Sequence, residues 1–117
     1  MNTTGFPSPA QDYEKQTFDF NELLIRHPSS TFSMRYEGED LQEFNIQKGD
    51  ILIVDCAFRP KKDFFGIVIF DNTFHCVYIQ KEQNSSTLYS YYKNRRIIIT
   101  NIFGIVVSVV RLYDYAC

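Results

Sequence analysis

The sequence has few of the residues on which several specialised kinds of site depend. It has no tryptophan, only five scattered glycines, and three cysteines without a close pair. Zinc sites usually need tight pairs such as CxxC, and phosphate-binding loops need clustered glycines, so neither a metal nor a nucleotide cofactor is expected. We expect reduced cysteines, with Cys56 and Cys76 as small apolar strand residues and Cys117 at an exposed end.

A positive net charge and long apolar runs are also absent. Lys and Arg number 12 against 14 Asp and Glu, which gives a formal net charge of -2 and disfavours unaided binding to nucleic acid or to an anionic membrane. The longest apolar run, 102–110, is interrupted by Gly104 and Ser108 and is too short to span a bilayer. The first residues lack the basic and apolar regions of a signal peptide. The sequence therefore predicts a cytoplasmic protein.

The residues that are present suit one small domain. A chain of 117 residues, 44% of them hydrophobic, can bury a core without metals or disulfides. Residues 1–17 contain Pro7 and offer little to bury, which predicts an extended N-terminal arm. Two interpretations are open for this arm: it docks through Phe6 and Tyr13, or it is a partly ordered tail. Residues 18–117 then form the folded domain.

The periodicity of the chain predicts one short helix followed by strands. Asp19 or Asn21 can cap a helix over residues 23–25, which must end before Pro28. Asp71 and its neighbour Asn72 separate two β-rich runs, as in a hairpin. We predict a mainly β, mostly antiparallel domain with strands at 31–36, 51–54 (apolar on both faces and therefore buried on both sides), 65–70, 74–80, 88–92, 97–100 and 102–112.

Few side chains suit catalysis. His27 stands next to Pro28 at a helix end, where a solvated or helix-capping role is favoured over a catalytic one. His75 and Cys76 are neighbours on one strand and therefore point to opposite faces, so they do not form a nucleophile pair.

Two clusters of charged residues remain, one acidic and one basic. The acidic cluster could hold a carboxylate pair or a metal ion, but a solvated turn is favoured. The basic cluster stands beside tyrosines, a combination that can grip single-stranded nucleic acid. Because it is short and the chain is acidic, a solvated hairpin rim or a protein contact is favoured. The acidic cluster is Glu37, Glu39 and Asp40, and the basic one is Lys93, Arg95 and Arg96 beside Tyr89, Tyr91 and Tyr92.

Seven short motifs, taken in order along the chain, carry a family resemblance. They are GFPSPA at 5–10, DY at 12–13, N at 21 with LLI at 23–25, HPS at 27–29, GDILIVD at 49–55, IFGIVV at 102–107 and VV at 109–110. Together they resemble the LexA/UmuD family of Ser–Lys self-cleaving proteins, and most closely the processed form of its UmuD branch. The resemblance implies a single, strongly curved β domain with a short N-terminal helix and an extended arm.

The family's catalytic pair does not carry over. In the family a serine is the nucleophile and a lysine, kept neutral by burial, is its base. The serine's stretch matches residues 37–41, which places Asp40 at the serine position. The lysine's strand matches residues 74–78, which places Val77 at the lysine position. The resemblance therefore implies a catalytically dead relative of these peptidases rather than an enzyme.

No substitute pair is evident in the sequence. Lys81 is four residues from Val77 along the same strand face, roughly 13 Å away, and Ser33 lies seven residues before Asp40. Only four residues precede Gly5, which matches the first residue of the family's processed product. We therefore expect a chain encoded in its already cleaved form.

The resemblance implies a non-catalytic accessory protein of SOS mutagenesis. Such a protein forms a homodimer and binds a Y-family translesion polymerase of the UmuC type, with a RecA-like filament and the sliding clamp as further partners and no cofactor. One alternative is a modulator that heterodimerises with an active UmuD-like or LexA-like protein, and another is a self-cleaving peptidase with relocated catalytic groups. Candidate partner or dimer contacts, for which core burial is the competing role in the last strand, are Phe6, Pro7, Tyr13, Phe103, Ile105, Val107 and Val109.

Overall fold

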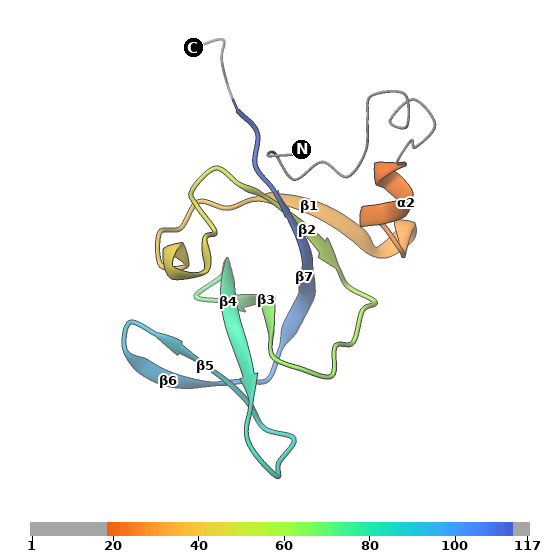
Figure 1. Ribbon diagram of the computed structural model, residues 1–117. Coiled ribbons are helices and arrows are strands. Elements are labelled where there is room, and N and C mark those ends of the chain that lie inside the picture. Colours follow the sequence, from red (N-terminus) through yellow and green to blue (C-terminus); the bar gives the residue numbers. More distant parts are fainter. Residues whose placement is uncertain (1–18, 114–117) are drawn as a thin grey trace, which may run out of the picture.

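A computed structural model describes residues 19–113 of the chain and shows the mainly β fold that the sequence predicts (Figure 1). The predicted N-terminal arm, including Phe6, Pro7 and Tyr13, lies outside the described residues, as does Cys117. All strand pairs are antiparallel, and the order across the seven-stranded sheet is β1-β2-β7-β3-β4-β5-β6. The elements are α2 (Phe20–Leu24), the 3-10 turn η1 (Pro28–Ser30), β1 (Thr31–Arg35), the 3-10 turn η2 (Gln42–Phe44), β2 (Ile51–Asp55), β3 (Phe64–Phe70), β4 (Thr73–Lys81), β5 (Leu88–Tyr92), β6 (Arg95–Ile99) and β7 (Ile102–Val110).

The short helix begins where the sequence predicts. The Asp19 side chain accepts a hydrogen bond from the Asn21 amide at 2.9 Å, which satisfies one of the free donors at the helix start. The helix ends before Pro28, and no residue of α2 is buried. Within residues 19–113, no helix is long and apolar enough to cross a membrane.

Two tight turns set the hairpins. Asp71 and Asn72 have φ angles of 52° and 59° between β3 and β4, and Lys93 and Asn94 have φ angles of 50° and 63° between β5 and β6. Paired left-handed residues of this kind match the right-handed twist of the flanking strands, and Asn and Asp tolerate them better than most residues. The Asp71–Asn72 hairpin predicted from the sequence is confirmed.

Strand β7 runs through the middle of the sheet and holds its two parts together. Figure 1 shows it curving between the β1–β2 pair and the remaining strands. It is not a regular strand, because it carries one extra residue on each side. Against β3 the pairing jumps from Gly104 to Ile102, and against β2 it jumps from Ser108 to Val106. These two β-bulges, at Phe103 and Val107, bend the strand and strengthen the curvature of the sheet.

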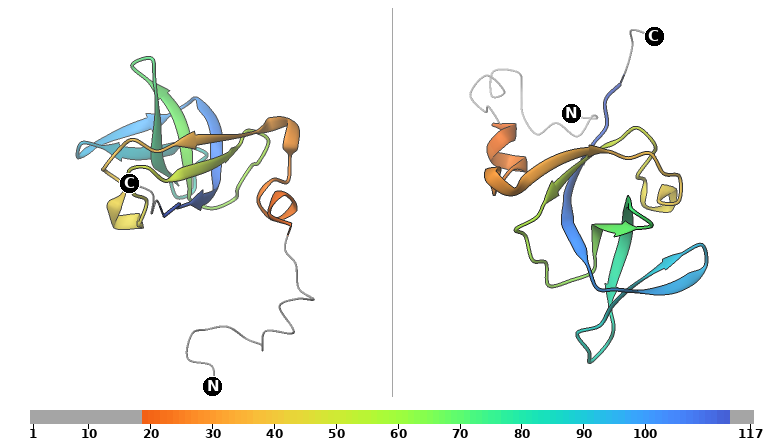
Figure 2. Two further views of the ribbon diagram at one scale, coloured as in Figure 1. Left: turned by 90° about the horizontal axis from the view of Figure 1, so that it is seen from above. Right: turned by 180° about the vertical axis from the view of Figure 1, so that it is seen from behind.

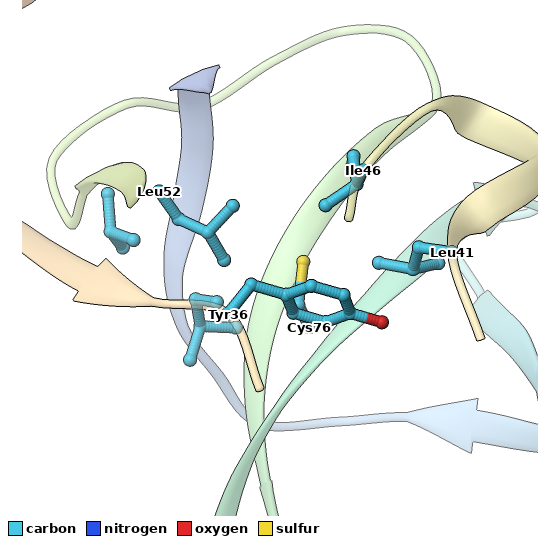
Figure 3. Packing of buried hydrophobic residues seen from close by; sticks show 7 residues of the cluster. Tyr36, Leu41, Ile46, Leu52 and Cys76 are labelled. Carbon is cyan, nitrogen blue, oxygen red and sulfur yellow. The ribbon is translucent and has the colours of Figure 1, made fainter. Parts of the chain in front are cut away.

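The sheet has a core on each face, and the β3–β4 hairpin contributes to both. Ile67 and Cys76 belong to the first core, whereas their neighbours Val68 and Val77 belong to the second. Successive side chains of a strand point to opposite faces, so a hairpin covered on both faces reads as a continuous apolar run. The first core comprises Tyr36, Leu41, Ile46, Leu52, Val54, Ile67 and Cys76 (Figure 3), and the second comprises Val68, Val77, Ile79 and Ile99.

A charged pair joins the end of β7 to the loop that precedes β2. The Asp50 carboxylate is 2% exposed and accepts hydrogen bonds from Nε and Nη2 of Arg111, both at 2.8 Å, and from the Gln47 amide at 2.8 Å. Arg111 also donates to the Asn45 carbonyl. The guanidinium of Arg111 holds the pKa of Asp50 below its usual value, against the opposing effect of burial. The pair therefore fixes the shape of the segment before β2.

We predict that Arg111→Met destabilises the protein at neutral pH. Removing the cation leaves a buried carboxylate unpaired, and because Arg111 is 35% exposed we expect a loss of about 1–3 kcal/mol rather than the full cost of a buried pair. The folded-state pKa of Asp50 is lowered, so its contribution is complete above about pH 4 and disappears as the pH falls through the depressed value. Urea unfolding as a function of pH measures this difference.

The matched control for this prediction is Arg96→Met. Arg96 pairs with Glu82 at 3.2 Å, and both side chains are more than 40% exposed. An exposed pair contributes less than about 1 kcal/mol. Equal losses in the two variants, or a loss for Arg111→Met that does not shrink in acid, would contradict the structural role assigned to the buried pair.

Candidate functional site

The two positions that the sequence resemblance assigns to the family's serine and lysine line one cavity. A cavity of about 440 Å³ is lined by Asp40, from the loop after β1, and by Val77, from the middle of β4. The β5–β6 hairpin closes its far side through Ser90 and Lys93. Two segments that are 37 residues apart in the sequence thus meet at this cavity.

Asp40 is held by a tyrosine rather than by a base. The Tyr36 hydroxyl donates a hydrogen bond to Oδ1 of Asp40 at 2.6 Å. Tyr36 is 5% exposed, and its ring lies across the first core beside Cys76 (Figure 3). A Cβ atom at Gly38 would lie 2.6 Å from the Tyr36 oxygen, so the absent side chain makes room for this hydroxyl. Burial, followed by the bond to Asp40, raises the pKa of Tyr36 well above its usual value, so the phenol remains a donor.

Val77 supplies no proton-transfer group. It is 4% exposed and packs in the second core with Val68, Ile79 and Ile99. Its neighbour Cys76 is the nearest thiol, but burial and the negative charge of Asp40 raise the pKa of Cys76 to about 12. Because the thiolate is the reactive form of cysteine, this thiol is inert at neutral pH.

The groups considered as substitutes do not form a catalytic couple in the described part of the chain. Ser33 lies on β1 and Lys81 at the end of β4, and neither lines the cavity of Asp40 and Val77. Ser90 and Lys93 do line it, yet no hydrogen bond joins them within residues 19–113. The Lys93 ammonium instead lies 5.4 Å from the centre of the Tyr92 ring.

The two histidines have structural partners. Nδ1 of His27 lies 2.6 Å from Oδ2 of Asp55, which is 2% exposed. His27 is exposed and precedes the η1 turn, as the predicted solvated or capping role implies, and its ring also ties the segment after α2 to the end of β2. Burial alone would raise the pKa of Asp55, but the hydrogen bonds from His27 and from the Ala57 and Phe58 amides bring it below the usual value. His75 packs between the Phe70 and Tyr92 rings.

The charged clusters have different surroundings. Glu37 and Glu39 are exposed, as expected for a solvated turn, and among residues 19–113 no group of three or more acidic, histidine or cysteine side chains could hold a metal ion. In the predicted basic cluster, Arg96 pairs with Glu82 and lies over the Tyr89 ring. A second basic cluster, Arg-Pro-Lys-Lys at 59–62, was not among the candidate sites predicted from the sequence. The run of three cations in four residues was the signal.

The candidate contacts on β7 are divided by its bulges. Ile105 is 4% exposed and lies inside the fold, where it does not reach the surface of this chain. Val107 and Val109 are 37% and 40% exposed. Phe103 is half-buried, and its ring packs against the largely exposed rings of Phe32 and Phe74. These residues therefore present a surface at Val107 and Val109 and an aromatic group around Phe103.

We predict that Cys76 reacts slowly with thiol reagents while the protein is folded. In a variant that carries Cys56→Ser and Cys117→Ser, modification by iodoacetamide at pH 8 should be at least about 100-fold slower than in urea, because little thiolate forms in the folded state. Adding Asp40→Asn removes the nearby negative charge and should increase the folded-state rate several-fold. Equal rates in the folded and unfolded protein would contradict the assigned burial.

Comparison with known protein sequences identifies the family of the chain. The family model for Peptidase S24-like proteins matches residues 1–107. The chain is 41% identical to ImpA of Salmonella typhimurium over 70 residues (60% of this chain and 48% of that protein) and 38% identical to MucA of Escherichia coli over 72 residues (62% and 49%). It is 39% identical over 70 residues to SamA of Salmonella typhimurium strain LT2 (60% and 50%). The chain spans about half the length of the curated relatives it matches. These matches confirm the resemblance carried by the sequence motifs, and the chain belongs to the Peptidase S24-like family.

Proposed function

We propose that this protein is a non-catalytic accessory protein of SOS mutagenesis. In this role it acts in the cytoplasm, forms a homodimer and binds a Y-family translesion polymerase of the UmuC type. Membership of the Peptidase S24-like family and the motifs shared with processed UmuD-like proteins support the proposal. The family's fold is retained, so the surfaces by which such a protein recruits partners have a scaffold.

The observation that carries the proposal is that Asp40 accepts a hydrogen bond from Tyr36 and shares its cavity with an apolar residue. Amide cleavage by this family needs a hydroxyl whose proton is taken by a neutral lysine. At the corresponding positions the chain has a carboxylate, engaged by the Tyr36 hydroxyl at 2.6 Å, and the alkyl side chain of Val77. A carboxylate held by a phenol beside an apolar side chain has no oriented partner for proton transfer. Recruitment of partners, rather than cleavage, is the activity that this arrangement favours.

The exposed part of β7 is the surface that we assign to dimerisation. Val107 and Val109 lie on β7, the last strand along the chain, and more than a third of the surface of each residue is exposed to solvent. The aromatic group around Phe103 is a second exposed apolar surface, since Phe32 and Phe74 are each about half exposed and pack on Phe103. Exposed apolar surface of this kind is typical of sites that bind another protein.

We predict that the wild-type chain forms a homodimer at micromolar concentration and that the Val107→Glu, Val109→Glu variant is monomeric. Burying two added carboxylates in an interface costs more than a marginal dimer can offset. Analytical ultracentrifugation measures the oligomeric state, and co-purification with a UmuC-type polymerase measures partner binding. Ile98→Glu is the matched control, because Ile98 is 56% exposed on β6 and should leave the dimer intact. A wild-type chain that forms neither a dimer nor a polymerase complex refutes the proposal.

We also predict that the chain does not cleave peptide bonds. Intact mass is followed during incubation with a RecA-like filament and nucleotide, and separately at alkaline pH, where family members with a lysine base self-cleave. An added peptide with an Ala–Gly bond serves as a second substrate, so that the result does not depend on the chain carrying a cleavable segment. Constant masses are expected. If fragments appear, the proposal fails, and Ser90→Ala and Lys93→Ala then test whether the catalytic couple has moved to the other wall of the cavity.

A further inference from the structure

A second cavity combines an apolar floor with a rim of one charge. It has a volume of about 690 Å³ and lies where the loop between β2 and β3 meets the end of β4 and the starts of β5 and β7. In Figure 1 the loop 56–63 runs along the right side of the fold, and the loop 82–87 lies at its lower end. The cations on its lining are Arg59, Lys61, Lys62 and Lys81, and no Asp or Glu side chain lines it.

These four cations have no anionic partner in the described part of the chain. The ion pairs within residues 19–113 involve His27, Arg96 and Arg111. Arg59 instead donates to the Cys56 and Phe58 carbonyls, which holds its guanidinium at the rim. Two acids directly follow these cations in the sequence, Asp63 after Lys62 and Glu82 after Lys81. Asp63 lines a neighbouring cavity and accepts from the Lys81 amide and, at 3.5 Å, from the Tyr78 hydroxyl, while Glu82 pairs with Arg96. A cleft lined by charges of one sign concentrates the field and attracts the opposite charge.

The floor of the cavity is mostly aliphatic. Leu88 and Ile102 are half-buried there, Ile99 is 9% exposed, and Phe64 is the only aromatic residue on the lining. An apolar centre surrounded by a charged rim is the usual composition of a protein–protein contact. Bases of single-stranded nucleic acid, in contrast, stack on several aromatic rings, and a long polyanion is repelled by a chain with a net charge of -2.

We infer that this cavity is a docking site for an acidic peptide segment of a partner protein, with an apolar side chain of the segment on the aliphatic floor and its carboxylates on the lysine rim. Complementary charge is the feature that selects this occupant. The inference is independent of the dimer surface proposed on Val107 and Val109, since those two residues do not line the cavity. It also holds whether or not the partner is a polymerase.

The test uses a fluorescein-labelled peptide of alternating Glu and Leu and measures its binding by fluorescence anisotropy. Lys61→Glu with Lys62→Glu should weaken binding at least about tenfold, because the rim charge is reversed. The matched control is Lys93→Glu with Arg95→Glu, which makes the same change of net charge on the β5–β6 hairpin and should change the affinity less than about twofold, as a remote site does. Circular dichroism confirms that each variant is folded.

A bulky substitution tests the contribution of the apolar floor separately from that of the charged rim. Ser86 is exposed on the cavity lining, and Ser86→Trp fills the space without altering any charge. We expect it to weaken binding of the Glu–Leu peptide at least about fivefold and to affect a Glu-only peptide less, because only the former uses the floor. Raising the salt concentration should weaken the binding of both peptides.

Three results would overturn the inference. The first is no binding of the Glu–Leu peptide by the wild-type chain at millimolar concentration. The second is an equal loss of binding in the two charge-reversal variants, which indicates a non-specific effect of net charge. The third is that an oligothymidylate binds more tightly than the peptide and that this binding is lost in the Lys61→Glu, Lys62→Glu variant. Such a result would assign the cavity to nucleic acid.

Discussion

The fold depends on the position of its last strand. β7 pairs with β2 along one edge and with β3 along the other, so within residues 19–113 it is the strand that links the backbone pairing of β1–β2 to that of the β3-to-β6 part of the sheet. The strand must come very close to β2, because a Cβ atom at Gly104 would lie 2.5 Å from Cγ1 of Val54. Its partners are far away in the sequence, and contacts of this kind form late and slowly during folding. The α2 segment and the β5–β6 hairpin then extend from opposite sides of this centre (Figure 2).

The same arrangement accounts for the cavity of Asp40 and Val77. The loop after β1 is fixed at one end by the pairing of β1 with β2 and at the other by the Asp50–Arg111 pair, while β4 is fixed by its burial on both faces. The scaffold therefore keeps the two positions on one cavity without help from a catalytic couple. The Tyr36 hydroxyl donates to the carboxylate of Asp40, so the position that the resemblance assigns to the family's serine makes a structural contact in this chain.

Local patterns predicted the local structure well. Asp71 and Asn72 predicted the hairpin, Asp19 the helix start, and the apolar run 51–54 a strand without an exposed residue. Contacts between distant segments were not predictable from such patterns. The His27–Asp55 pair spans 28 residues and the Arg111–Asp50 pair spans 61, and nothing in the local sequence indicates either partner.

The bulges of β7 and the position of Asp40 and Val77 on one cavity could not be predicted from local sequence patterns either. A simple alternation along 102–112 does not indicate the extra residues at Phe103 and Val107, so it could not tell which side chains reach the surface. Asp40 and Val77 were placed together only through the family resemblance, because residues on separate elements carry no spacing signal. The cations at 59–62 were visible in the sequence, but the apolar floor beneath them comes from three other strands.

The burial of Val77 limits what a single substitution at position 40 or 77 can do chemically. A lysine at this position, 4% exposed in the second core, would be kept neutral by desolvation only if no anion faced it. Asp40 lies on the same cavity, and its carboxylate would favour the protonated ammonium, which is no base. A serine at position 40 without a lysine at position 77 would lack a base to take its proton. Neither substitution alone therefore supplies a proton-transfer couple, and both positions must change together to form one.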